Sequence, residues 1–153
     1  MNYIGASLAA IQGLDHAQVA AIANHLDALR RARRQVWLCG NGGSAANVEH
    51  LTAHLQEAGI RATDLMTFKA TLTAYSNDFG YDRALMRQLR NLASAGQALV
   101  VVSGSGDSPN IIMALAEARR IGMLTIGLLG FGGGMAVGLC DASLLVPSKE
   151  YGP

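Results

Sequence analysis

One stretch of the chain constrains the fold more than any other. Residues 36–39 are an apolar run, residues 40–43 contain three glycines around Asn41, and a helical pattern starts at Ser44. This order predicts a buried strand, a tight turn and a helix, because glycine tolerates positive φ and lets a ligand approach the main chain closely. The unpaired N–H groups and the dipole of the helix would favour an anion in the turn, most often phosphate.

A second loop of the same kind supports this interpretation. Residues 103–110 read Ser-Gly-Ser-Gly-Asp-Ser-Pro-Asn. A single glycine turn is more often only a tight connection, but two such loops in one short chain favour a binding role. The hydroxyls of Ser103, Ser105 and Ser108, with the helix amides from about residue 109, suit a phosphomonoester held without fixed positive charge. We also expect Ser108 to cap the following helix and Asp107 to point away from the anion.

Composition and charge narrow the class of protein. The 153 residues are enough for one domain with a real core, and the net charge of +1 gives no reason to expect nucleic acid or a membrane surface as a partner. No apolar run reaches the ~20 residues of a membrane span, and the first residues lack the pattern of a secretory signal. Cys39 and Cys140 lie far apart, so we expect reduced thiols in a cytoplasmic protein.

Apolar runs alternate with helical periodicity, which predicts an α/β fold with a mostly parallel sheet and helices on both faces. Strands are expected near residues 35–39, 60–65, 97–103, 123–129 and 142–146. Helices are expected at 2–12, 15–34, 44–57, 69–75, 82–94, 109–121 and 135–139, with a loop at 76–81. In such a three-layer α/β/α sandwich the ligand binds at the C-terminal ends of the strands. The helix at 15–34 precedes the first strand, so we expect it to pack on a neighbouring subunit.

The two loops do not match the common nucleotide-binding patterns. No G-x-G-x-x-G follows the first strand, although Asp64 comes near the acidic position after the second strand, and no Gly-Lys-Ser/Thr occurs. We therefore expect no nucleotide cofactor.

Five segments together resemble the sugar isomerase (SIS) domain family. They are CGNGGSAANVEH, LTAYSNDFGYD, SGSGDSPNII, GMLTIGLLGFGGGMA and DASLLVPSKEYG. Within this family they are similar to the phosphoheptose isomerases, and the resemblance covers nearly the whole chain from residue 35. It implies a five-stranded parallel sheet of flavodoxin-like or Rossmann-like type and a homotetramer with active sites between subunits. It also implies isomerisation of sedoheptulose 7-phosphate to a heptose 7-phosphate, in carbohydrate metabolism that supplies lipopolysaccharide or capsule heptose.

The resemblance further implies a division of the chain and a set of site residues. Residues 1–34 would be an N-terminal helical segment for oligomer packing, and residues 35–153 the phosphosugar-binding domain. The residues expected to line the phosphosugar are Asn41, Gly42, Gly43, Ser44, Asn77, Asp78, Ser103, Gly104, Ser105 and Ser108.

The chain also departs from the family pattern. The helix after the first turn usually reads H-x-x-x-E, whose glutamate is a metal ligand and a candidate base, whereas here His50 is followed by His54. Gly104 replaces the threonine of the usual Ser-Thr-Ser loop, and the segment before Asn77 is shorter. The family's closing helix supplies a glutamine and a second histidine. Because the given sequence ends at Pro153, we expect residues 1–153 to bind a phosphosugar with little turnover.

His50, His54 and Glu57 stand at i, i+4 and i+7 and share one helix face. Two histidines one turn apart can chelate Zn²⁺ with a carboxylate as third ligand, although two polar histidines at a subunit interface would give the same pattern. Isomerisation also needs a base near pH 7, and an imidazole with an ordinary pKa near ~6.5 makes His54 the candidate catalytic residue. The other interpretation is a non-catalytic SIS-domain protein that binds phosphosugars or regulates a partner, as one relative does with the bacterial replication initiator.

Overall fold

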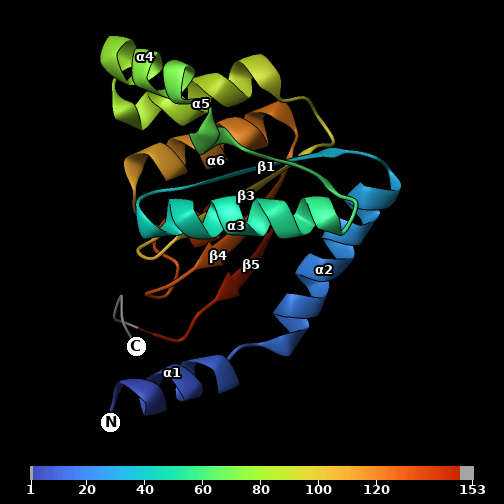
Figure 1. The fold of residues 1–153 in the computed structure, drawn as a ribbon, viewed down its shortest axis with the longest axis vertical. Helices are drawn as coiled ribbons and strands as arrows, with labels where there is room; N and C mark the ends of the chain where they lie inside the picture. The colour runs from blue at the N-terminus through green and yellow to red at the C-terminus, as the bar shows by residue number, and fades with distance from the viewer. Residues whose placement is uncertain (1, 149–153) are drawn as a thin grey trace.

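A computed structural model describes residues 2–148 (Figure 1). The Tyr-Gly segment at residues 151–152, which the family resemblance uses, lies outside this range. The elements are α1 (Tyr3–Gln12), α2 (His16–Arg31), β1 (Gln35–Gly40), α3 (Gly43–Glu57), β2 (Arg61–Asp64), η1 (Leu65–Thr67), α4 (Lys69–Phe79), α5 (Tyr81–Leu92), β3 (Ala98–Ser103), α6 (Pro109–Ile121), β4 (Leu124–Leu129), η2 (Ala136–Leu139) and β5 (Ala142–Leu145).

The five strands form one parallel sheet in the order β2-β1-β3-β4-β5. β1 lies beside β3, with Gly40 opposite Val102, so the loops that follow these two strands emerge side by side. The expected three-layer α/β/α sandwich is confirmed, and the strand order is the flavodoxin-like one.

Alternate residues of the central strands pack into two separate hydrophobic cores, one on each face of the sheet. Val36, Leu38 and Val100 pack with residues of α2 and α3 on one face of the sheet. Cys39 and Val101 pack with residues of α5 and α6 on the other face. Both faces are covered, which is why β3 reads as an unbroken apolar run rather than an alternating one. α4 packs on the outer side of α5, away from the sheet (Figure 1).

The second helix packs on the sheet of its own chain, a place that the sequence analysis did not give it, and its expected contact with a neighbouring subunit stays a prediction. Ile22 and Leu29 of α2 are buried in the core that contains Val36, and Gln18 accepts a hydrogen bond from the N–H of Leu145 in β5 at 3.3 Å. Asp15 caps the helix as expected, accepting from the N–H of Ala17 at 2.8 Å. α2 therefore covers the sheet of its own chain.

The helix with an uncovered apolar face is α1 instead. It lies below the main body of the molecule in Figure 1, joined to it through α2. Its exposed apolar side chains are Tyr3, Ile4, Leu8 and Ile11.

The predicted loop at residues 76–81 is wrong. α4 continues to Phe79, and the hydroxyl of Ser76 donates to the carbonyl of Leu72 within the helix at 2.7 Å. The break between α4 and α5 is confined to Gly80, whose φ of 90° is readily adopted by glycine.

The structure also bears on membrane spans and on the two cysteines. No helix among residues 2–148 is both long and apolar enough to cross a bilayer. Cys39 and Cys140 are free thiols, and burial raises the pKa of Cys39 to about 12 and that of Cys140 to about 11. Neither thiol is reactive near neutral pH as a result.

Candidate functional site

The glycine turn and the serine loop meet at the C-terminal edge of the sheet. Asn41, in the glycine turn, and Asn110, in the first turn of α6, exchange two hydrogen bonds between their amide side chains, at 2.9 and 2.8 Å. The hydroxyl of Tyr81, the first residue of α5, donates to the same oxygen of Asn41 at 2.7 Å. Burial raises the pKa of Tyr81, so its hydroxyl stays protonated and able to donate near neutral pH. Sequence reasoning missed both Asn110 and Tyr81.

The serine loop is folded by its own hydroxyls. Ser103 accepts from the N–H of Gly106 at 3.0 Å, and Ser105 accepts from the N–H of Asp107 at 3.2 Å. Ser108 is the N-cap residue of α6, but its side chain makes no capping bond, so the expected hydroxyl cap is wrong. The Ser108 carbonyl instead accepts from the N–H groups of Ile111 and Ile112, both at 3.0 Å. The Ser108 hydroxyl is thus not committed to the helix end.

A third loop, at residues 130–135, buttresses the serine loop. The side chain of Asp107 accepts from the N–H of Met135 at 2.8 Å, and the carbonyl of Gly106 accepts from the N–H of Ala136 at 2.9 Å. Asp107 is therefore turned toward the glycine-rich loop, in line with the expectation that it points away from an anion.

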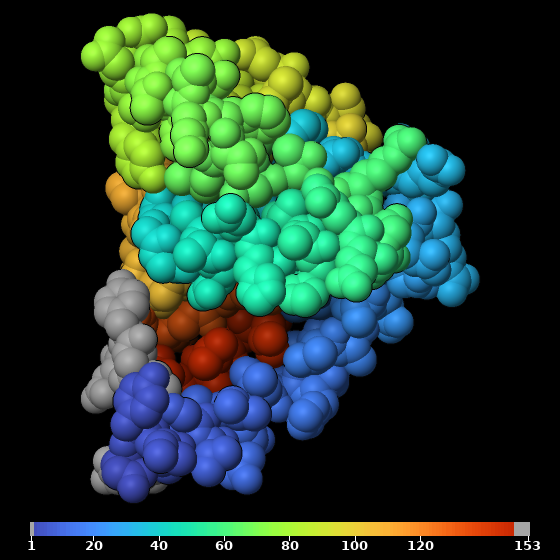
Figure 2. Space-filling model, viewed as in Figure 1, coloured from blue at the N-terminus to red at the C-terminus, as the bar shows by residue number. Residues whose placement is uncertain are grey.

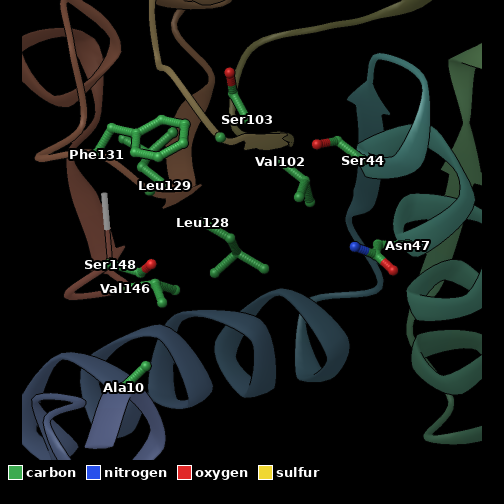
Figure 3. Close-up of a pocket in the computed structure, with 12 residues that line it drawn as sticks. Ala10, Ser44, Asn47, Val102, Ser103, Leu128, Leu129, Phe131, Val146 and Ser148 are labelled. Carbon is green, nitrogen blue, oxygen red and sulfur yellow. The ribbon is translucent and has the colours of Figure 1, made fainter. Parts of the chain in front are cut away.

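A cavity of about 340 Å³ opens beside these loops (Figure 3). Of the expected site residues, Ser44, Ser103 and Gly104 line it. Its other lining residues are Ala10, Asn47, Val102, Leu128, Leu129, Gly130, Phe131, Val146 and Ser148. Ser44 and Asn47 of α3 lie on one side and Phe131 on the other, with Leu128 between them (Figure 3). Figure 2 shows the hollow between α3 and the N-terminal helices, with strands of the C-terminal part at its base.

The expected site residues that do not line this cavity are Asn41, Gly42, Gly43, Asn77, Asp78, Ser105 and Ser108. Asn77 and Asp78 are exposed in the last turn of α4, where Asn77 donates to Asp78 at 2.9 Å. Gly42 and Gly43 are exposed at the start of α3. The missed residue Asn47 could have been found from helical spacing, because it lies one turn after Ser44 on the same face of α3.

That face of α3 continues to the two histidines. His50 and His54 follow Asn47 at i+3 and i+7, and their Nε2 atoms are 2.9 Å apart. Glu57 lies 3.7 Å from Nδ1 of His54, the nitrogen that faces away from His50. Within residues 2–148 no three or more His, Cys, Asp or Glu side chains are grouped as a metal site requires. The pair thus supplies two converging nitrogens, and Glu57 does not join them as a third ligand.

Asp64, which came near the dinucleotide pattern, has a structural role. It ends β2 and accepts from the N–H of Met66 at 2.8 Å, which starts η1. Burial raises the pKa of this carboxyl.

The family is established by comparison with known proteins. The SIS domain model matches residues 1–130, and the chain belongs to that family. It is 46% identical over 122 residues to a phosphoheptose isomerase of Aliarcobacter butzleri, covering 76% of this chain and 65% of the relative. It is 40% identical over 131 residues to one of Nitratiruptor, covering 82% and 70%. The resemblance drawn from the five sequence segments is confirmed.

Solved structures agree with this membership. A phosphoheptose isomerase from Neisseria gonorrhoeae superposes with a TM-score of 0.88 at 34% identity, covering 97% of this chain and 82% of the other. One from Francisella tularensis gives a TM-score of 0.89 at 30% identity, with 97% and 81% covered. The chain thus spans about two thirds of its matched curated relatives and about four fifths of these structures.

Proposed function

We propose that this protein is a phosphosugar aldose-ketose isomerase that converts sedoheptulose 7-phosphate to a heptose 7-phosphate for lipopolysaccharide or capsule heptose. The observation that carries the proposal is the cavity lined by Ser44 of α3 and by Ser103 and Gly104 at the start of the serine loop, in a fold that superposes on a phosphoheptose isomerase with a TM-score of 0.88. The serine hydroxyls and the amides at the start of α6 would hold the phosphate.

The face of α3 that carries His50 and His54 is the part of the molecule where we expect the proton transfer to take place. Ser44 is beside the cavity and His54 is ten residues further along the helix, which corresponds to ~15 Å at ~1.5 Å per residue. A long, open-chain sugar phosphate anchored at the loops would extend its carbonyl end along this face. His54 would remove a proton from C1 of the ketose and return it to C2, while the proton on O1 passes to O2. This leaves the aldose with no net change in atoms.

Zinc binding is the alternative role that we propose for the same two histidines. The Nε2 atoms of His50 and His54 converge, which suits two of the nitrogen ligands of a Zn²⁺ ion, and the described residues offer no third ligand beside them. A bound Zn²⁺ would supply Lewis acidity toward the sugar oxygens. In that case His54 would serve as a ligand, and the proton transfer would need another group.

We also propose that the protein is an oligomer, with a homotetramer as the expected state, and that it is cytoplasmic. The exposed apolar side chains of α1, which include Ile4 and Ile11, would be covered by a second copy. The free thiols Cys39 and Cys140 fit a reducing compartment.

The test is to incubate the full-length protein with sedoheptulose 7-phosphate, with and without Zn²⁺, and to look for an aldose product. Formation of the aldose supports the isomerase. Binding without product, in both conditions, would favour the non-catalytic binding or regulatory protein. If the protein neither binds the sugar phosphate nor forms the aldose, the phosphosugar assignment is overturned.

A further inference from the structure

The side chain of Asn41 is saturated by protein partners at its oxygen. An amide oxygen accepts at most two hydrogen bonds in good geometry. Asn110 and Tyr81 provide both, at 2.8 and 2.7 Å. The Asn41 oxygen is therefore unavailable to a ligand. Its hydrogen bonds instead hold the glycine turn in place.

The partners of Asn41 belong to other elements of the fold. Asn110 is in the first turn of α6, directly after the serine loop, and the residue is only 2% exposed. Because two amides that exchange both bonds face each other edge to edge, the pair fixes both separation and orientation. Tyr81 adds a tie from α5. The pair therefore sets the separation and orientation of the glycine turn relative to the serine loop.

We infer that Asn110 is a positioning residue that holds the two anion-binding loops in register through its reciprocal bonds to Asn41. The inference rests on the proposed function for the identity of the ligand, but not for the geometry of the pair. Amide and hydroxyl donors on separate loops bind one phosphate well only when held within about 0.5 Å of the productive geometry. Loss of register should therefore weaken binding even though Asn110 does not contact the ligand.

The variant N110D separates positioning from simple loss of fold. A protonated carboxyl has one acceptor and one O–H donor and reproduces the amide pairing, whereas a carboxylate turns an oxygen toward the oxygen of Asn41. Burial and this repulsion raise the pKa of the introduced carboxyl. The pairing should consequently be broken at pH 8 and recover as the pH falls to 5.

Two readouts are measured at each pH for the wild type, N110D and the matched control N24D, whose site is exposed on α2. The first is affinity for sedoheptulose 7-phosphate relative to the wild type at the same pH. The second is hydrogen exchange of the backbone amides of Ser44, Ala45 and Ala46, which bond to the carbonyls of Asn41 and Gly42. We expect N110D to bind about tenfold more weakly at pH 8, with faster exchange, and to approach the wild type at pH 5.

Unchanged exchange at these three amides in N110D at pH 8 would overturn the inference, as would a loss of affinity that is the same at every pH. A wild type that does not bind the sugar phosphate would contradict the proposed function, while the exchange readout would still decide the role of Asn110. If N110D does not fold, N110S decides, because it removes the reciprocal bonds to Asn41 without adding a charge. We then expect about tenfold weaker binding and faster exchange, and an unchanged N110S would overturn the inference.

Discussion

The carbonyl oxygen of Gly133 occupies the space that a Cβ atom on Gly106 would need. Gly106 follows β3 and Gly133 follows β4, so two loops from neighbouring strands are in direct backbone contact. The serine loop is thus supported by backbone contact as well as by the bond from the N–H of Met135 to the side chain of Asp107. A Cβ atom on Gly134 would in turn meet the carbonyl oxygen of Ser105, so each of the two loops needs a glycine where it faces the other.

The variant G106A should destabilise the protein and weaken phosphosugar binding. A Cβ at this position would push the loops apart and would also stand at a φ of 70°, so we expect a loss of about 2–4 kcal/mol in the free energy of unfolding. G132A is the matched control, because Gly132 has a φ of 84° but nothing within 4 Å of its would-be Cβ. It should lose only about 1 kcal/mol. Denaturant unfolding of both variants measures this difference, and equal losses would contradict the contact.

The double variant S105A/S108A should weaken phosphosugar binding with little effect on stability. The Ser108 side chain makes no capping bond to α6, so only the exposed loop bond of Ser105 is lost, at about 0.5–1 kcal/mol. S94A, at another exposed serine, is the control. Titration calorimetry with sedoheptulose 7-phosphate measures the affinity. An affinity equal to that of the wild type would refute the role of these hydroxyls.

Glu117 should make stability depend on pH. Hydrogen bonds from Arg120 and Arg90 lower the pKa of this buried carboxyl from 4.5 to about 2. A lowered pKa in the folded state means that the stabilisation is complete above about pH 5 and is lost as the pH falls toward 2. At pH 7, E117Q should therefore reduce the free energy of unfolding by about 2–3 kcal/mol, and E57Q, at an exposed glutamate, by almost nothing.

The measurement for Glu117 is the difference in unfolding free energy between the wild type and E117Q at several pH values. The difference should shrink steadily between pH 5 and pH 3. A difference that is constant over this range would show that the carboxylate charge is not what stabilises the α5–α6 contact.

The two histidines should bind Zn²⁺ as a pair. We expect H50A and H54A each to weaken Zn²⁺ binding by at least about tenfold, because each removes one of the two converging nitrogens. H25A, at an exposed histidine of α2, is the control. Competition with a chromogenic chelator measures the affinity. Zinc binding that is unaffected by either substitution would remove the metal from the proposal.

The sheet and its layers could be predicted from the sequence because each strand is a short run of consecutive apolar residues followed by a turn. The apolar run before Ser103 and the glycines after Cys39 are local signals. Even so, the polar composition of residues 76–81 suggested a loop, whereas α4 continues to Phe79.

The candidate site was less predictable because its ties are made between distant residues. Asn41 and Asn110 are 69 positions apart, and no periodicity connects them. The contact of Gly106 with Gly133 likewise depends on the order of strands in the sheet. The serines could be named as candidates because hydroxyl-rich glycine loops are a local signature of anion binding, and their role stays a prediction.

The measurement that tests the isomerase proposal most directly is NMR of sedoheptulose 7-phosphate incubated with the full-length protein in D₂O. The exposed His54 should exchange its proton with solvent between removal from C1 and delivery to C2. The proposal predicts an aldose 7-phosphate carrying deuterium at C2 from the wild type, and no product from H54A, which should still bind the sugar phosphate. A wild type that leaves the ketose unchanged, with and without Zn²⁺, would contradict it.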